Sequence, residues 1–388
     1  MEIITGDRDD LIDMLDDAIG QVGQVKTREQ KMAFYNFVGN LYGSINVNSE
    51  LDFHIDYKDC FINRRNFLKF MKQADLYSKR FCSRFYDFKE FHKDYLGDIL
   101  IAYGEHVKEL KDVPCSDEST WYLGKDKFYD VLCGFLEEYG LLDKFKEFAK
   151  KPRVFSKIKK NPKDDYSGLT IFNPVNKDAA FLIKDADYDL DTLFIYIHEF
   201  GHVVDLQSID VDPYQALNSY AYMSTYPEVF SKLLEKLFLQ YLIDNNILSD
   251  QAKDKYIGQF LTNHDFLMSS YMFSLLDDKY YRGGKELCIS DEQFIEEMCK
   301  YFSNRELIEE MVRESGLNLF NDYIYGYGEI MATHLLEPVK ADGLGCEQFR
   351  DFQRIRFQPF DPEYLIKNGY TSEKFAEVLQ KEVQLCKK

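Results

Sequence analysis

Apolar residues recur at three- and four-residue spacing through most of the first 160 positions, as they do along one face of an α-helix. The spacing is regular over residues 9–22, 27–42, 63–78 and 126–149. Proline is scarce in this part, and no stretch alternates convincingly between apolar and polar residues as a half-buried strand would. We therefore expect residues 1–160 to form a helical wall or lid.

The pattern changes after a lysine-rich stretch at 144–163, which contains two prolines. We interpret this stretch as a solvated linker and as the boundary between residues 1–160 and 161–388. Beyond it, residues 167–174 and 179–184 are short and rich in β-branched and aromatic side chains, with a few polar residues between them. Such a pair of segments predicts a small antiparallel hairpin.

A buried helix is expected next, because several aspartates at 187–191 precede an apolar run that starts at Leu193. The residues that follow are apolar almost all round, which is typical of a helix buried on most sides. Gly201 in its middle costs about 1 kcal/mol relative to alanine, which suggests close approach of another backbone, from a substrate or a strand. A strongly amphipathic helix opens near Thr225. The sequence thus predicts a mostly α-helical fold with a small β-hairpin or sheet beside the buried helix.

Composition narrows the class of protein. The chain has 388 residues, 45% hydrophobic and 16% aromatic, which is typical of a packed globular protein. Its net charge of -19 argues against a nucleic-acid partner, and no apolar run is long enough for a membrane span. The acidic N-terminus has no signal-peptide pattern, and the eight cysteines have no C-x-x-C spacing. We therefore expect a cytoplasmic protein with reduced thiols.

The candidate chemistry lies in the buried helix, in the sequence His-Glu-Phe-Gly-His at 198–202. Histidines four residues apart lie on the same helix face, so His198 and His202 can both bind one metal ion. Glu199 between them is placed to act as the general base on a water molecule, as in zinc peptidases. The nucleotide motifs G-x-x-x-x-G-K-[ST] and G-x-G-x-x-G are absent from the sequence.

A catalytic zinc site needs a third protein ligand and one open position. Glu228 is the first candidate, although Thr225-x-x-Glu228 is also a capping-box pattern in which the glutamate would only bind helix-end amides. Glu235, two turns further, could be the ligand instead or could orient a histidine. Asp205 and Asp212 are weaker candidates.

An oxyanion donor is also expected, and a tyrosine hydroxyl can serve. Tyr323, Tyr325 and Tyr327 alternate with isoleucine and glycine, although a chance cluster is possible because the chain has 28 tyrosines. The histidines outside these motifs are more consistent with surface or packing roles; they include His54, His92, His106 and His264.

At this point the chain resembles the thimet oligopeptidase and oligoendopeptidase F family of zinc peptidases. The resemblance begins in residues 165–205, with Ser-Gly-Leu-Thr, Ala-Phe-Leu-Ile and then HEFGHVVD. The family pattern Glu-x-x-Ser-x-x-x-Glu matches Glu228, Ser231 and Glu235. Residues 272–281, 323–327 and 352–383 are also similar to this family, so the likeness covers roughly residues 165–388.

The resemblance implies a zincin-type fold in which His198, His202 and Glu228 hold one Zn²⁺ and Glu199 is the general base. It also implies that one of the three tyrosines binds the oxyanion. Three departures are visible: the helical part before the motif is shorter than usual, residues 316–321 lack a histidine common in the family, and Asp205 stands where the family tends to have another residue. These departures concern substrate length and transition-state stabilisation rather than metal binding.

The sequence therefore predicts a zinc-dependent metalloendopeptidase, an oligopeptidase acting on short or unstructured peptides, with 161–388 as its catalytic domain. One alternative is a zinc-bound protein that binds peptides with little or no turnover, and another is a structural helical protein with a coincidental motif. The cleavage preference and the oligomeric state are not predicted.

Overall fold

The computed structural model describes residues 3–47, 121–155, 167–183, 186–210, 226–249, 322–356 and 362–371, with single residues or pairs near 212, 252–256, 292–309 and 373–377. Within these residues the fold is mostly helical with a small three-stranded sheet, as the sequence predicts. Among the described helices, none has both the length and the apolar character needed to cross a bilayer. The three described cysteines, Cys133, Cys299 and Cys346, are free thiols.

The N-terminal helices follow the predicted spacing. Helix α1 (Arg8–Gly20) begins with a capping box in which Asp7 binds the amide of Asp10 and Asp10 binds the amide of Asp7, and α2 (Arg28–Val47) follows it. The predicted helix at 126–149 is instead two helices, α4 (Lys125–Glu138) and α5 (Leu142–Ala149). The break lies at Gly140, which has φ +67° and ends α4 in a Schellman motif. The helix expected at 63–78 lies outside the described residues.

The predicted hairpin is confirmed. Strands β2 (Gly168–Phe172) and β3 (Ala179–Ile183) pair antiparallel, with Thr170 opposite Phe181. A third strand, β1 (Val154–Phe155), pairs parallel with β3, which makes the sheet order β1-β3-β2. The linker interpretation is therefore wrong for residues 144–155, because this stretch contains the buried end of α5 and a strand of the sheet.

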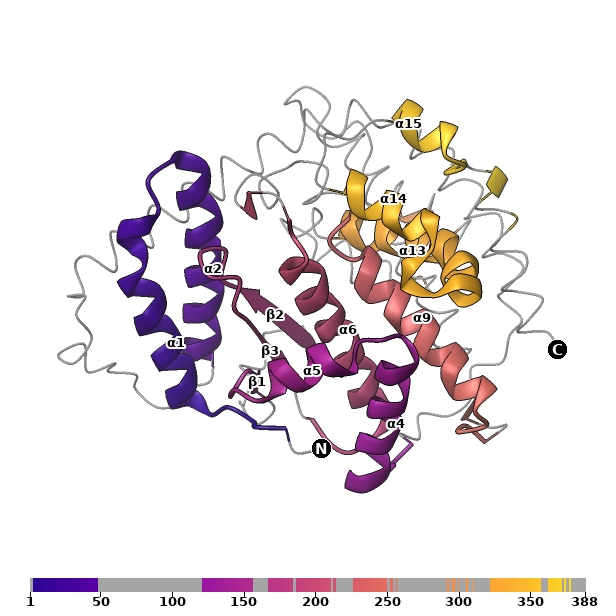
Figure 1. Ribbon diagram of the computed structural model, residues 1–388, viewed down its shortest axis with the longest axis horizontal. Coiled ribbons are helices and arrows are strands. Elements are labelled where there is room, and N and C mark those ends of the chain that lie inside the picture. Colours follow the sequence, from indigo (N-terminus) through magenta and orange to yellow (C-terminus); the bar gives the residue numbers. More distant parts are fainter. Residues whose placement is uncertain are drawn as a thin grey trace.

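The sheet lies between two layers of helices (Figure 1). Residues of β3 alternate between two clusters: Ala180 and Leu182 pack with α1 and α2, whereas Phe181 and Ile183 pack toward α6 (Leu190–Gln207). All five residues of β3 are buried, as expected for a central strand covered on both faces. Because β3 is paired on both sides, a peptide strand cannot add to residues 179–183; β2 is an outer strand of the described sheet.

Beyond α6 the helices continue in layers. Helix α9 (Val229–Asp244) packs on α6, and α13 (Asp322–Asp342) packs on α9 from the other side, with α14 (Glu347–Ile355) next to it (Figure 1). The short helix α15 (Pro362–Lys367) follows. The motif helix α6 thus lies between the sheet and α9, and its flanking residues are largely buried, as the sequence predicts.

Candidate metal centre

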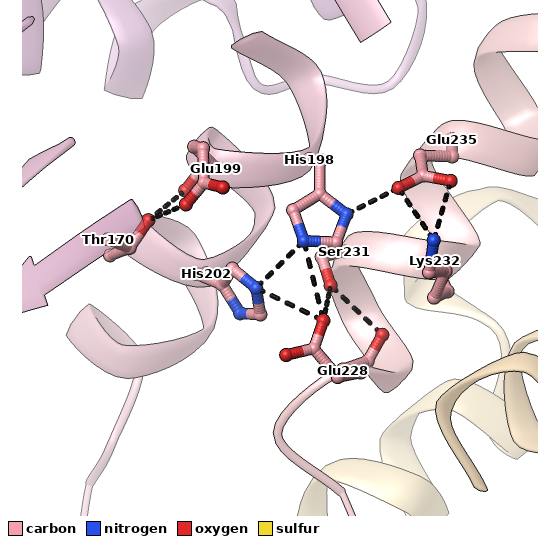
Figure 2. A network of polar contacts seen from close by, with 8 residues as sticks. All are labelled: Thr170, His198, Glu199, His202, Glu228, Ser231, Lys232 and Glu235. Carbon is pink, nitrogen blue, oxygen red and sulfur yellow. Dashed lines mark hydrogen bonds and ion pairs between the residues drawn. The ribbon is translucent and has the colours of Figure 1, made fainter. Parts of the chain in front are cut away.

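The two motif histidines lie one turn apart on α6, whose first turn is capped by the carboxylate of Asp189. Their Nε2 atoms are 3.1 Å apart, and their ring centroids are 4.8 Å apart. Figure 2 shows both rings directed away from the sheet, toward the start of α9. The side chains of His198 and His202 are 16% and 14% exposed, so the pair is mostly withdrawn from solvent but accessible.

Glu228 joins the histidines from the residue just before α9. Its Oε2 lies 3.4 Å from Nε2 of His198 and 3.3 Å from Nε2 of His202. Glu228 occupies the N-cap position of α9 and makes no side-chain capping bond, so the capping interpretation is wrong. Burial would raise the pKa of this carboxyl, but the two histidines outweigh it and hold the pKa well below its usual range.

The three donor atoms fit a tetrahedral metal ion. Zinc bonds to histidine nitrogen and carboxylate oxygen are about 2.0–2.2 Å long, which places two ligands of a tetrahedral ion about 3.3–3.6 Å apart. The three separations in this group are 3.1, 3.3 and 3.4 Å, close to that triangle. His198, His202 and Glu228 can therefore hold a metal ion and leave a fourth position open.

Glu235 supports one of these histidines rather than joining the group. Its Oε1 accepts a hydrogen bond from Nδ1 of His198, and both of its carboxylate oxygens lie 3.1 Å from Nζ of Lys232. With the proton on Nδ1, the Nε2 lone pair of His198 is free to bind a metal ion. Burial raises the pKa of Glu235, but Lys232 and His198 outweigh it and lower that pKa to about 2. Glu235 is therefore placed to orient a histidine.

The same carboxylates act on His198. Burial lowers its pKa, but Glu235 and Glu228 outweigh this effect and raise the pKa to about 10. A metal ion binds the unprotonated Nε2, so an ion and a proton compete for this nitrogen.

Glu199 points from α6 toward β2, since consecutive helix residues project about 100° apart. Its side chain is buried against β2, where Oγ1 of Thr170 donates a hydrogen bond of 2.5 Å to Oε2 (Figure 2). The same hydroxyl lies 3.1 Å from the backbone oxygen of Glu199. Gly168 in β2 leaves room for this carboxylate, since a Cβ there would lie 2.8 Å from both Cγ and Cδ of Glu199. One helix thus directs its histidines toward α9 and its glutamate toward the sheet.

The close approach expected at Gly201 is present, but the partner is a helix. A Cβ at Gly201 would lie 2.8 Å from Cα of Ser231, in the first turn of α9. Ser231 in turn donates through Oγ to the backbone oxygen of Glu228 at 3.0 Å, and the same Oγ lies 3.3 Å from Oε2. Gly201 therefore lets α9 approach closely enough for Glu228 to reach the histidines.

The weaker ligand candidates lie elsewhere. Asp205, near the end of α6, forms a buried ion pair with Arg356, which also donates to Oγ of Ser208 at 2.7 Å. Asp212 is exposed and is not part of the metal-ligand group. A pair between two chain segments 151 residues apart gives Asp205 a structural role.

The three candidate tyrosines all fall within α13, next to α9. Tyr325 is half-buried; the side chains of Tyr323 and Tyr327 lie outside the described residues, as do His54, His92, His106 and His264. Which tyrosine reaches the metal centre therefore stays a prediction.

Sequence reasoning assigned no role to three residues that contact the site: Gly168, Thr170 and Lys232. Lys232 had a local signal, because it lies three residues before Glu235 on a helix. The others act on residues of different elements, for which the sequence carries no local pattern.

No protein-family model matches this chain, and no curated protein matches it. Among solved structures, the chain is similar to the crystal structure of a candidate peptidase from Chlamydophila abortus, with 13% sequence identity and a TM-score of 0.49. The alignment covers 98% of this chain and 62% of that protein, so this chain spans less than two thirds of its length. The similarity is weak, and function has to be inferred from the side chains of the site.

Proposed function

We propose that this protein is a zinc-dependent metallopeptidase that hydrolyses short or unstructured peptides, of the thimet oligopeptidase and oligoendopeptidase F type. The observation that carries the proposal is the triangle of donor atoms from His198, His202 and Glu228, with Glu235 bound to the outer nitrogen of His198. Two histidines, one carboxylate and an open position are the ligand set of catalytic rather than structural zinc.

In this proposal each residue has one task. A bound zinc ion would act as a Lewis acid toward the scissile carbonyl. Glu199 would accept the proton of the attacking water and deliver it to the leaving amine. The Oε2 of Glu199 is held by Thr170, so Oε1 is the oxygen available for that proton. A tyrosine of α13, one of Tyr323, Tyr325 and Tyr327, would donate a hydrogen bond to the oxyanion.

The proposal also assigns a role to each of the two parts of the chain. Residues 161–388 would form the catalytic domain, and residues 1–160 would form a wall or lid that limits substrate length. Helices α4 and α5 share a hydrophobic core with α6. Residues 121–155 would therefore support the catalytic helix rather than form part of the lid.

The test is a digestion of mixed short and long unstructured peptides, read by mass spectrometry. The parent, Glu199→Gln and a control, Glu337→Gln at an exposed position of α13, would be compared with their zinc content. We expect cleavage by the parent and the control, no cleavage by Glu199→Gln, and one zinc ion in all three. Glu228→Ala should lose zinc.

Other outcomes separate the alternatives. Bound zinc and bound peptide without cleavage by the parent would indicate a peptide-binding protein. A parent without stoichiometric metal would refute the proposal.

A further inference from the structure

The first turn of α9, which carries Glu228, is enclosed by two helices through two glycines. Gly201 of α6 meets this turn at Cα of Ser231, as described above. Gly328 of α13 meets it from the other side: a Cβ there would lie 2.5 Å from Cβ of Glu228, 3.0 Å from its carbonyl carbon and 3.2 Å from its carbonyl oxygen. Glu228 is therefore held in place by α13 as well as by its own helix.

The contact at Gly328 cannot be relieved by rotation of a side chain. The atoms that it meets are the Cβ and backbone of Glu228, and moving them moves the whole residue. Glycine in a helix interior is less stable than alanine by about 1 kcal/mol, a cost that is explained here by the close approach of Glu228. Gly328 therefore sets how near α13 lies to the residue that supplies the third donor.

A second contact fixes α13 at this distance. Lys236, two turns along α9 from Glu228, forms an ion pair with Glu329 of α13. Both side chains are almost fully buried, at 1% and 4% exposure. A buried charge is strongly unfavourable without its partner, so this pair stabilises one relative placement of the two helices.

We propose that α13 is a positioning element for the metal ligand Glu228, with Gly328 as the positioning residue. Helix α13 also contains the three candidate tyrosines. Because coupling between two equilibria is reciprocal, metal binding must in turn stabilise the docked state of α13. The metal centre would therefore control the order of the helix that carries the tyrosines. This inference rests on the proposed function only in requiring that the centre binds zinc.

The first test is the zinc affinity of Gly328→Ala, measured by competition with a chromophoric chelator. We expect binding about 10- to 100-fold weaker than in the parent, the usual loss when a residue that supports a ligand is changed. Gly39→Ala is the matched control, since Gly39 also lies inside a helix but a Cβ there meets nothing within 4 Å. It should bind zinc as the parent does. Substitution of cobalt for zinc would show whether the ligand geometry has changed.

The second test needs no variant and remains valid if Gly328→Ala does not fold. Hydrogen exchange of the parent is followed with and without saturating zinc. We expect zinc to slow amide exchange in α13 and to leave α1, on the far side of the sheet, unchanged.

Two outcomes would overturn the inference: parent-like zinc affinity in Gly328→Ala, or exchange in α13 that does not respond to bound zinc. A parent that binds no zinc would instead refute the proposed function, which keeps the two failures distinct. A fold defect alone would lower the free energy of unfolding of Gly328→Ala without changing the zinc affinity of the folded fraction.

Discussion

Replacing Gly168 with alanine should slow the proposed catalysis strongly while leaving the candidate metal centre intact. The new Cβ would lie 2.8 Å from both Cγ and Cδ of Glu199, and still closer to Oε1, whereas ordinary contacts are 3.4–4 Å. The carboxylate would have to retreat from β2 by about 1 Å, and a misplacement of that size costs about 100-fold in rate. The rings of His198 and His202 point away from β2 and would not be touched.

The assay is steady-state cleavage of a peptide found in the library digestion, with kcat and KM separated. We expect Gly168→Ala to lower kcat about 100-fold, equivalent to about 2.7 kcal/mol in the activation barrier, with zinc affinity within twofold of the parent. Gly23→Ala is the control, because a Cβ at Gly23 meets nothing within 4 Å. Thr170→Val should also lower kcat, since it removes the hydroxyl that holds Glu199, and Thr170→Ser should restore part of it.

The reasoning would be refuted by a Gly168→Ala protein whose kcat stays within threefold of the parent. It would also be refuted by a loss of zinc as large as the loss of rate, because the effect would then not be confined to the carboxylate of Glu199.

Three further predictions concern the residue that supports His198 and two buried groups of the core. Glu235→Gln should weaken zinc binding about 10- to 100-fold by chelator competition, because His198 loses its carboxylate partner; unchanged affinity would exclude an orienting role. Asp205→Ala should lower the free energy of unfolding in urea by about 3–5 kcal/mol, since the guanidinium of Arg356 stays buried without the carboxylate that it pairs with. The double variant Asp205→Leu with Arg356→Met should recover most of the lost stability. Burial lowers the pKa of His334 from 6.5 to about 4, so the unfolded state binds a proton more readily than the folded state. The contribution of His334 to the free energy of unfolding is therefore fully present above pH 6.5. It falls by up to about 3 kcal/mol as the pH approaches 4. His334→Phe should flatten that dependence, and an equally steep loss in the variant would contradict it.

The elements with local signals were predictable from the sequence. The hairpin follows from two β-rich segments around a polar turn, and α6 follows from the acidic residues around Asp189 and the apolar run behind it. Strand β1 was missed because it has only two residues, and the residues of β3 that it pairs with lie 27 positions further along the chain. The break at Gly140 was missed because the apolar spacing continues across it and only the backbone turns.

For the site, the sequence indicated the three candidate donors and offered Glu235 as a possible support, but gave no sign of Gly168, Thr170 or Gly328. The motif itself places His198 and His202 on one face, because helix geometry alone does so. The pattern around Thr225 left Glu228 undecided between ligand and cap, since that choice depends on how α9 packs on α6. Gly328 could not have been found, because its partner lies 100 positions earlier and its contribution is the absence of a side chain.

Helix α6 lies between two different supports: the sheet holds Glu199, and α9 holds the ligands through Glu228 and Glu235. Turnover and metal retention would therefore be separable by mutation. A substitution confined to the strand side, at Gly168 or Thr170, would leave a chain that still binds zinc but cleaves far more slowly. A metal-dependent peptide receptor is therefore a short evolutionary step from a peptidase built this way. The reverse step is as short, because restoring one small residue on β2 would return the carboxylate to its place.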